Sequence, residues 1–225
     1  MIKICREMTL AALVGTSVLP WSTGAAVAQT VDILKEWNTI KAPPAPAIKP
    51  VTIDPKKTAF FALDFNGLNC VPDKRARCAA YIPNVKKLLD QARAHGMPIV
   101  ITHTHHMTPK DLHPFVTPQK GDIVYQGEED KFYDNDVAKT LKAKGVDTIL
   151  MTGTSTNGAL LFTAFGAALR GFKIIVPIDT VPSDTAYQEQ FSLWELVNAP
   201  EFRNDNLTTL TRSDMIKFAD AAAKP

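Results

Sequence analysis

The stretch VDTILMTGTSTNGALLFTAFGAALRGFKIIVPIDT, residues 146–180, decides the fold class. It begins with an apolar run at 147–153 and continues with a helical pattern at 156–171 that ends at Gly171. A second apolar run follows at 172–179. Two short apolar runs joined by one helix are typical of neighbouring parallel strands with a right-handed crossover. The stretch therefore predicts a parallel sheet covered by helices.

The same alternation extends outward on both sides of this unit. Apolar runs at 58–64 and 97–103 precede it, and a short run at 207–211 follows it. This repeated pattern predicts one doubly wound, mainly parallel α/β domain at 58–225, Rossmann-like, with helices on both faces in three layers. The remaining helical patterns lie at 83–96, 136–145, 185–199 and, closing the chain, 213–223.

The first 28 residues have the pattern of a secretory signal peptide. Lys3 and Arg6 precede an apolar run at 10–19 that is too short to span a bilayer. Ala26-Val27-Ala28 then gives a small-x-small cleavage site, so we expect cleavage between Ala28 and Gln29. An uncleaved anchor helix is the alternative. Export of this kind predicts a secreted or bacterial periplasmic protein.

Residues 29–57 form the second part of the leader and include KAPPAPAIKP. Such a proline-rich segment favours an extended arm over the surface of the domain or of a neighbouring subunit.

Two cysteines remain after the expected cleavage, Cys70 and Cys78. An oxidising compartment favours a disulfide between them, which would contribute about 2.5 kcal/mol in the chain-entropy model. Two free thiols or a metal-binding pair are the alternatives.

The composition of the chain excludes two classes of partner. The formal net charge is only +2, and no dense Lys/Arg cluster interleaves with aromatic residues, so nucleic acid is not an expected partner. No stretch after the signal approaches the roughly 20 apolar residues of a membrane span. There is no GxGxxG, phosphate-binding loop or CxxC, so we expect no nucleotide cofactor.

Ligands of open parallel sheets bind beyond the carboxyl ends of the strands. The residues at the predicted strand ends are therefore the candidates for a site. They are Asp64, His103 to His106, Gly153 to Asn157, and Asp179.

At these strand ends the chain resembles the isochorismatase-like (cysteine hydrolase) family. AFFALDFN, at 59–66, is similar to the opening strand of the family, and 146–180 is similar to its most characteristic stretch. The resemblance covers most of 58–181. It implies a doubly wound parallel sheet, hydrolysis of a small molecule, and homo-oligomers that often complete each other's sites.

The resemblance implies an Asp-Lys-Cys triad that is incomplete here. Asp64 occupies the place of the acid/base Asp, whereas Ala159, by nature or by engineering, stands where the family has the nucleophilic Cys. Either Lys131 or a position near Gln126 corresponds to the Lys. Ala159 cannot form a covalent acyl-enzyme. Some isochorismatases also lack this Cys and split an enol ether with water, which leaves Asp64 as the proton carrier.

Further residues are expected around the substrate. In the family, the place of Thr154-Ser155 is a non-proline cis peptide beside an oxyanion site, and we expect Thr156 to N-cap the helix that follows. The expected substrate-binding residues are Asn66, His103, His105, Gln126, Phe132, Thr154, Ser155, Thr156, Asn157 and Ala159.

The histidines of THTHHM, at 102–107, are candidate ligands for a metal ion. His103 and His105 would share one face of a strand, near Asp64 and His113, although pocket lining or hydrogen bonding behind the site is the plainer interpretation. We expect no cofactor, with a metal ion as the alternative.

These observations predict a periplasmic hydrolase that cleaves an amide, ureide or enol-ether bond by Asp64-assisted attack of water, with Lys131 as the second catalytic residue. An inactive ligand-binding descendant of the fold and a metal-dependent amidase using the histidines are the alternatives.

Overall fold

The computed structural model describes residues 32–200, 202 and 206–219. The chain divides into two units, at 1–43 and 44–225. The described part of the first unit holds one helical turn, α1 (Ile33–Glu36), continued by η1 (Trp37–Thr39), and its side chains are exposed. The expected signal peptide lies outside the described residues. Within the described ranges, no helix has the length and apolar character that crossing a membrane requires.

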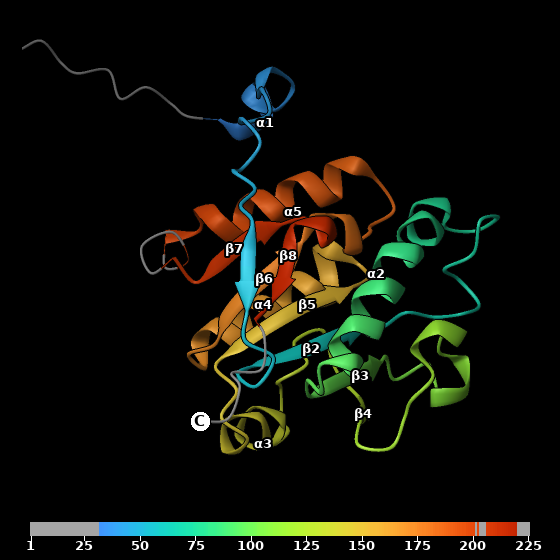
Figure 1. Cartoon of the computed structure of the whole chain (residues 1–225). Coiled ribbons are helices and arrows are strands. Elements are labelled where there is room, and N and C mark those ends of the chain that lie inside the picture. Colours follow the sequence, from blue (N-terminus) through green and yellow to red (C-terminus); the bar gives the residue numbers. More distant parts are fainter. Residues whose placement is uncertain (1–31, 201, 203–205, 220–225) are drawn as a thin grey trace, which may run out of the picture. The chain divides into compact units, whose positions relative to one another are not determined.

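The second unit is built on a six-stranded parallel sheet (Figure 1). Its strand order, β4-β3-β2-β5-β6-β7, changes direction at β2, as in a doubly wound sheet. This confirms the predicted fold class. The strands are β2 (Thr58–Leu63), β3 (Ile99–His103), β4 (Ile123–Gln126), β5 (Thr148–Gly153), β6 (Lys173–Pro177) and β7 (Thr208–Thr211).

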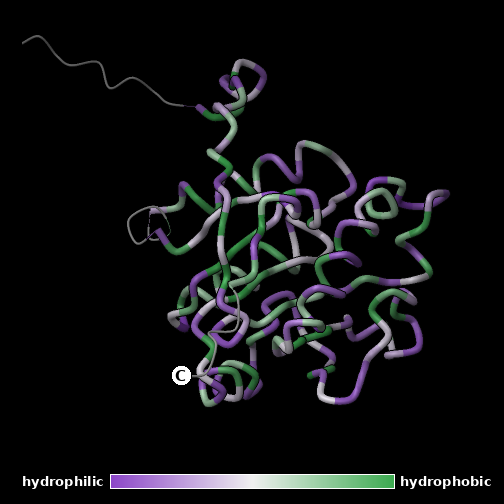
Figure 2. Tube along the Cα trace, viewed as in Figure 1, coloured by the Kyte–Doolittle hydropathy of each residue, from purple (hydrophilic) through white to green (hydrophobic). Residues whose placement is uncertain are grey.

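Helices cover both faces of this sheet and give it two cores. Phe61 and Leu63 of β2 point into one core, which α3 (Val137–Ala143), α4 (Leu161–Leu169) and α5 (Ala186–Asn198) complete. Phe60 and Ala62 point into the other, against α2 (Ala76–Ala94). Every residue of β2 is buried because both faces are covered, which explains its unbroken apolar run. The central strands accordingly have hydrophobic colours in Figure 2.

Two sequence predictions about helices were wrong. Over the described residues 213–219, the closing helix expected at 213–223 is instead η6 (Ser213–Met215) followed by β8 (Ile216–Phe218). Strand β8 pairs in parallel with β1 (Val51–Ile53), a partner more than 160 residues away that no local pattern reveals. Helix α2 begins seven residues before the expected Pro83, which therefore lies inside the helix and not in its first turn.

The end of the proline-rich segment belongs to the folded unit. The Lys49 amide donates a hydrogen bond to the Leu210 carbonyl of β7 at 2.9 Å, and the Ile53 side chain is buried in the second core. Residues 51–53 form strand β1, so this end of the segment is part of the folded unit.

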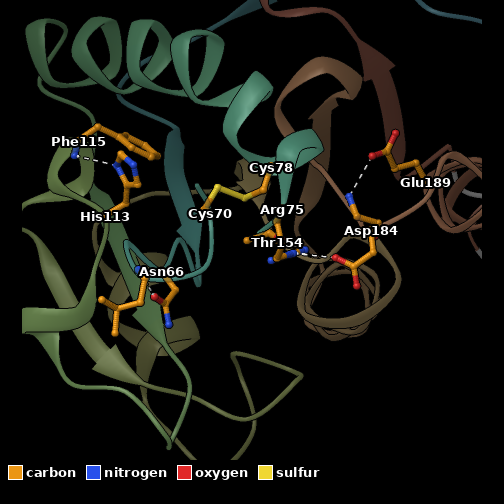
Figure 3. Close-up of a disulfide and its surroundings, with 11 residues drawn as sticks. Asn66, Cys70, Arg75, Cys78, His113, Phe115, Thr154, Asp184 and Glu189 are labelled. Atoms are coloured by element: carbon orange, nitrogen blue, oxygen red, sulfur yellow. Dashed lines mark hydrogen bonds and ion pairs between the residues drawn. A yellow bond between two sulfur atoms is a disulfide. The ribbon is translucent and has the colours of Figure 1, made fainter. Parts of the chain in front are cut away.

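Cys70 and Cys78 form a disulfide, with Cα atoms 5.1 Å apart, and both residues are buried. It closes the loop between β2 and the first turn of α2 (Figure 3).

We expect Cys70→Ser to lower the free energy of unfolding by about 2.5 kcal/mol, because the reduced chain regains the entropy of an open loop. Urea unfolding of the exported protein, with and without the substitution, measures this difference. Thiol titration of denatured, unreduced protein should find neither Cys70 nor Cys78. Two free thiols before any reductant is added would contradict the pairing.

Candidate active site

Asp64 lies where β2 ends, at the point where the strand order reverses. Its backbone has φ +54°, a left-handed conformation that Asp and Asn adopt more readily than other side chains do. The Thr102 hydroxyl of neighbouring β3 donates to Asp64 Oδ1 at 2.7 Å. The left-handed residue ends the strand, and Thr102 fixes the direction of its carboxylate.

Lys131 supplies the cation at this carboxylate. Its Nζ lies 2.8 Å from Asp64 Oδ2, and the two side chains are 1% and 5% exposed. The ammonium also donates to the Gly127 carbonyl at 3.3 Å. A Cβ at Gly127 would lie 2.9 Å from Lys131 Cδ, so glycine leaves room for the lysine side chain.

The geometry decides between the two candidate positions for the lysine. Lys131 reaches Asp64 from the loop that follows β4, whereas Gln126 is exposed at the end of β4, in register with His103. The basic side chain at Asp64 therefore comes from a position five residues later than the one the family spacing indicates.

Several hydrogen bonds hold the backbone of this loop. The Lys131 amide donates to Thr163 Oγ1 of α4 at 3.2 Å, and the same hydroxyl donates to the Glu129 carbonyl at 3.1 Å. The Lys131 carbonyl accepts from the Tyr125 hydroxyl and from Asn135 Nδ2. Burial, with the negative charges of Asp130 and Asp64, raises the pKa of Tyr125, so its hydroxyl keeps its proton, and can donate, to a higher pH than usual. Lys131 is thus anchored at its backbone as well as at its ammonium.

The turn after β5 completes the site. The Thr154 amide donates to the Leu63 carbonyl at 3.0 Å, which places the turn beside Asp64. The Thr154–Ser155 peptide is cis, as the resemblance implied. Next, η4 (Thr156–Leu160) is a π-type turn that leads into α4 and carries the buried Ala159.

The expected helix cap at Thr156 was wrong. Ser155 occupies the N-cap position without a side-chain cap, and the Thr156 hydroxyl instead donates to the Val181 carbonyl. Thr156 is fully buried, so it ties the turn to the loop after β6 instead of facing a ligand.

A cavity of about 410 Å³ opens over this turn at the carboxyl ends of the strands. It brings together five predicted residues: Asp64, Asn66, Thr154, Ser155 and Ala159. A second cavity, of about 340 Å³, lies at the opposite, amino ends of β2, β5 and β6 and contains none of them. The first cavity also contains Thr104 and His106, from the strand-end candidates at 103–106. Four further lining residues were not singled out by the sequence: Asn69, Arg75, Met107 and Glu129.

The missed residues come from loops. Met107 ends the histidine-rich segment, directly after the strand-end candidates at 103–106. Arg75 belongs to the disulfide-closed loop, and Glu129 is two residues before Lys131. No periodicity fixes the path of such loops, so the sequence held no signal for their direction.

The other predicted binding residues lie outside the lining of this cavity. His103 is buried with Nδ1 near the Thr104 carbonyl, and His105 is exposed 3.7 Å from Glu128. Phe132 packs in the core against Phe61 and Phe172. Asn157 accepts a hydrogen bond from the Ser183 hydroxyl at 2.8 Å. Gln126 and Thr156 have the positions given above.

Asp179, another strand-end candidate, has a structural partner. Its carboxylate accepts hydrogen bonds from the Ser213 amide and hydroxyl at 2.8 and 2.7 Å. The alternative of a metal site needs at least three ligands close together. No group of three His, Cys, Asp or Glu side chains is placed to hold an ion among residues 32–200, 202 and 206–219.

The assembled site is a charge-paired carboxylate facing a pocket without a nucleophilic thiol. Asp64 can accept or donate a proton at the cavity, while Lys131 balances its charge from behind. Ala159 leaves only a methyl group at the place of the family's sulfur. The arrangement thus fits proton transfer to or from water, and it excludes a thioester at position 159.

Comparisons with known proteins agree with this fold. The chain is 30% identical over 82 residues to maleamate amidohydrolase of Pseudomonas putida, covering 36% of this chain but only 38% of that relative. It is 24% identical over 134 residues to the uncharacterized isochorismatase family protein YaaI of Bacillus subtilis, covering 52% and 74%.

Among solved structures, the fold matches an isochorismatase-like hydrolase from Alkaliphilus metalliredigens with a TM-score of 0.60. The match has 23% identity and covers 70% of this chain and 95% of that one. The model of the isochorismatase domain matches residues 51–204, more than half of the sequence. With the β2 aspartate and the characteristic turn in place, the chain belongs to the isochorismatase family.

Proposed function

We propose that this protein is a periplasmic hydrolase that cleaves a C–N amide or ureide bond, or an enol ether, of a small molecule with water. The observation that carries the proposal is the buried Asp64–Lys131 pair, whose carboxylate lines the same cavity as Ala159. A buried ion pair at a pocket wall is a frequent feature of catalytic sites. The periplasmic location rests on the signal-peptide pattern alone.

In the proposed reaction at an amide, Asp64 accepts a proton from water as the water oxygen bonds to the carbonyl carbon. The C–N bond then breaks, and the leaving nitrogen takes the proton from Asp64, so the carboxylate is regenerated. For an enol ether the order is reversed: the carboxylic acid form of Asp64 protonates the vinyl carbon before water adds to the oxocarbenium carbon. The adding water returns a proton to Asp64, and the hemiketal C–O bond then breaks to release an alcohol and a carbonyl compound. Lys131 stays behind the carboxylate throughout and keeps Oδ2 in place.

The likeness to a maleamate amidohydrolase favours the amide among these bonds, although it spans little more than a third of that relative. A second candidate function, ligand binding without turnover, is favoured by one observation: Ala159 removes the nucleophile of the family while the pocket is retained.

The test is a panel of amides, ureides and enol ethers incubated with the exported protein, with and without iodoacetamide. We expect hydrolysis of one class of compound. The rate should be the same after alkylation, because the cysteines at 70 and 78 are paired. The mass spectrum should contain no acyl-enzyme, because Ala159 has no thiol. Loss of activity on alkylation would contradict the water mechanism. Binding without any turnover would favour the second candidate.

A further inference from the structure

A buried carboxylate that does not line the cavity, Glu189 of α5, accepts hydrogen bonds from three residues. Arg77 of α2 donates to both oxygens, from Nε to Oε1 at 3.0 Å and from Nη2 to Oε2. The Tyr81 hydroxyl donates to Oε2 at 3.1 Å, and the Ser183 amide donates to Oε1 at 3.0 Å. Bonds to both oxygens fix the direction of this carboxylate.

These bonds join α2 to α5 and to the connection that precedes α5, residues 178–185. Arg77 and Tyr81 are one helical turn apart on α2, so they lie on the same side of the helix. Asn84, three residues further on, donates from Nδ2 to the Asp179 carbonyl at 3.2 Å. The connection and the first turn of α5 are therefore held along one polar stripe of α2.

The same connection holds the turn after β5 that lines the cavity. The Thr156 amide donates to the Pro182 carbonyl at 3.2 Å, and the Thr156 hydroxyl donates to the Val181 carbonyl. The Ser183 hydroxyl donates to Asn157 Oδ1 at 2.8 Å. Three hydrogen bonds therefore join the connection to the two residues that follow the cis peptide.

A further link reaches the turn through Arg75. Its Nε donates to Asp184 Oδ1 at 2.7 Å, and its Nη2 donates to Thr154 Oγ1 at 2.8 Å (Figure 3). Asp184 follows Ser183, whose amide is bonded to Glu189. The turn is therefore held on both sides of its cis peptide by one connection, and Glu189 holds that connection.

The connection depends on side chains for its support because its backbone is irregular. Residues 181–185 form neither helix nor strand, yet Val181 and Ser183 are fully buried. The amide of a buried irregular residue needs an acceptor from elsewhere, and for Ser183 this is Glu189 Oε1. An unpaired buried amide is costly, so loss of the carboxylate favours local opening of the connection.

We propose that Glu189 is a positioning residue of the site: it fixes the connection at 181–184, which in turn fixes the turn at 154–157. Glu189 itself touches no ligand. The inference rests on the proposed function only in taking this turn as a wall of the ligand site, and it holds for a binding protein as well as for a hydrolase.

Amide hydrogen exchange, followed by NMR on the exported protein, tests this coupling without a substrate. In Glu189→Gln one oxygen becomes an NH₂ group, which cannot accept from the donors of α2. We expect the Thr156 amide to exchange about tenfold faster than in the wild type. The Asp64 amide, which donates to the Thr102 carbonyl at 3.2 Å, should change much less. Equal acceleration of both amides would indicate a general loss of stability and overturn the proposal.

Two further variants keep the test specific. Glu195→Gln is the matched control, because Glu195 lies on the same helix and its carboxylate has no hydrogen-bond partner within the described ranges. It should leave the exchange of the Thr156 amide unchanged. Arg77→Gln, at a side chain that is 40% exposed, replaces Glu189→Gln if that protein does not fold, and should act in the same direction. Unchanged exchange at Thr156 in a folded Glu189→Gln protein would also overturn the proposal.

Turnover separates this inference from the proposed function. With the substrate that the panel identifies, Glu189→Gln should lower kcat by about tenfold and leave KM within about threefold. Selective exchange at Thr156 with an unchanged kcat would overturn the role in the site. Selective exchange without turnover of any compound by the wild type would contradict the hydrolase and leave the inference standing. Turnover by the wild type, with unaltered exchange in Glu189→Gln, would contradict the inference and leave the hydrolase standing.

Discussion

Replacing Lys131 by methionine should lower the free energy of unfolding by about 3–5 kcal/mol at pH 7, a large part of the stability of a domain this size. The substitution keeps the length and apolar body of the side chain but leaves the Asp64 carboxylate buried without its counter-charge. The Thr102 hydroxyl, 2.7 Å from Oδ1, would be its main remaining partner among the described residues. An uncompensated buried charge is among the most costly changes in a protein interior.

Urea unfolding followed by circular dichroism measures this loss. Lys139→Met is the matched control, because Lys139 is exposed on α3 and its replacement should change stability by less than about 0.5 kcal/mol. Adding Asp64→Asn to Lys131→Met should recover part of the loss, because the unpaired charge is then removed. If Lys131→Met unfolded at the same urea concentration as the control, the two side chains would not form a buried pair.

The strands and the carboxylate were predictable from sequence because their signals are local. A segment buried on both faces must be apolar throughout, so TAFFAL and its neighbours indicate central strands. Asp64 follows the first of these, and the carboxyl ends of parallel strands share one edge of the sheet. That edge is where the cavity lies.

The sequence named Lys131 but could not decide between it and Gln126, because the position of the lysine depends on how a loop is held against a helix. Thr163 of α4 binds the backbone on both sides of Asp130. Gly166 leaves the space that the Asp130 carboxylate fills, since a Cβ there would lie 2.2 Å from Asp130 Oδ1. These contacts direct the Lys131 side chain toward Asp64. The spacing of residues in the sequence does not indicate them.

The pairing of β1 with β8 and the direction of Arg75 escaped prediction for a related reason. Both depend on contacts between segments far apart in the sequence: residues 51–53 with 216–218, and Arg75 with Thr154. Periodicity reports which face of an element is buried but not which distant segment covers it.

Asp64→Asn should reduce turnover of whichever substrate the panel identifies by about 10²–10⁴-fold, the range expected for loss of a general acid/base. Asparagine has the same shape, tolerates the left-handed backbone at φ +54°, and still accepts from Thr102. It cannot take a proton from water. The substitution also leaves Lys131 unpaired, so stability must be measured beside activity.

Asp64→Glu provides an independent test if the asparagine variant does not fold. It keeps the negative charge for Lys131 but moves the carboxylate by one methylene group. A misplacement of about 1 Å can cost on the order of 10²-fold in rate, so we expect a folded protein with strongly reduced turnover.

The rate of the Asp64 variants relative to the wild type, at saturating substrate and with binding measured separately, tests the central claim most directly. We expect Asp64→Asn and Asp64→Glu still to bind ligand while turnover falls by about 100-fold or more. The control Asp90→Asn, at an exposed position on α2, should retain the wild-type rate. Wild-type turnover in a folded Asp64→Asn protein would contradict the account, because hydrolysis would then proceed without the carboxylate on which it rests.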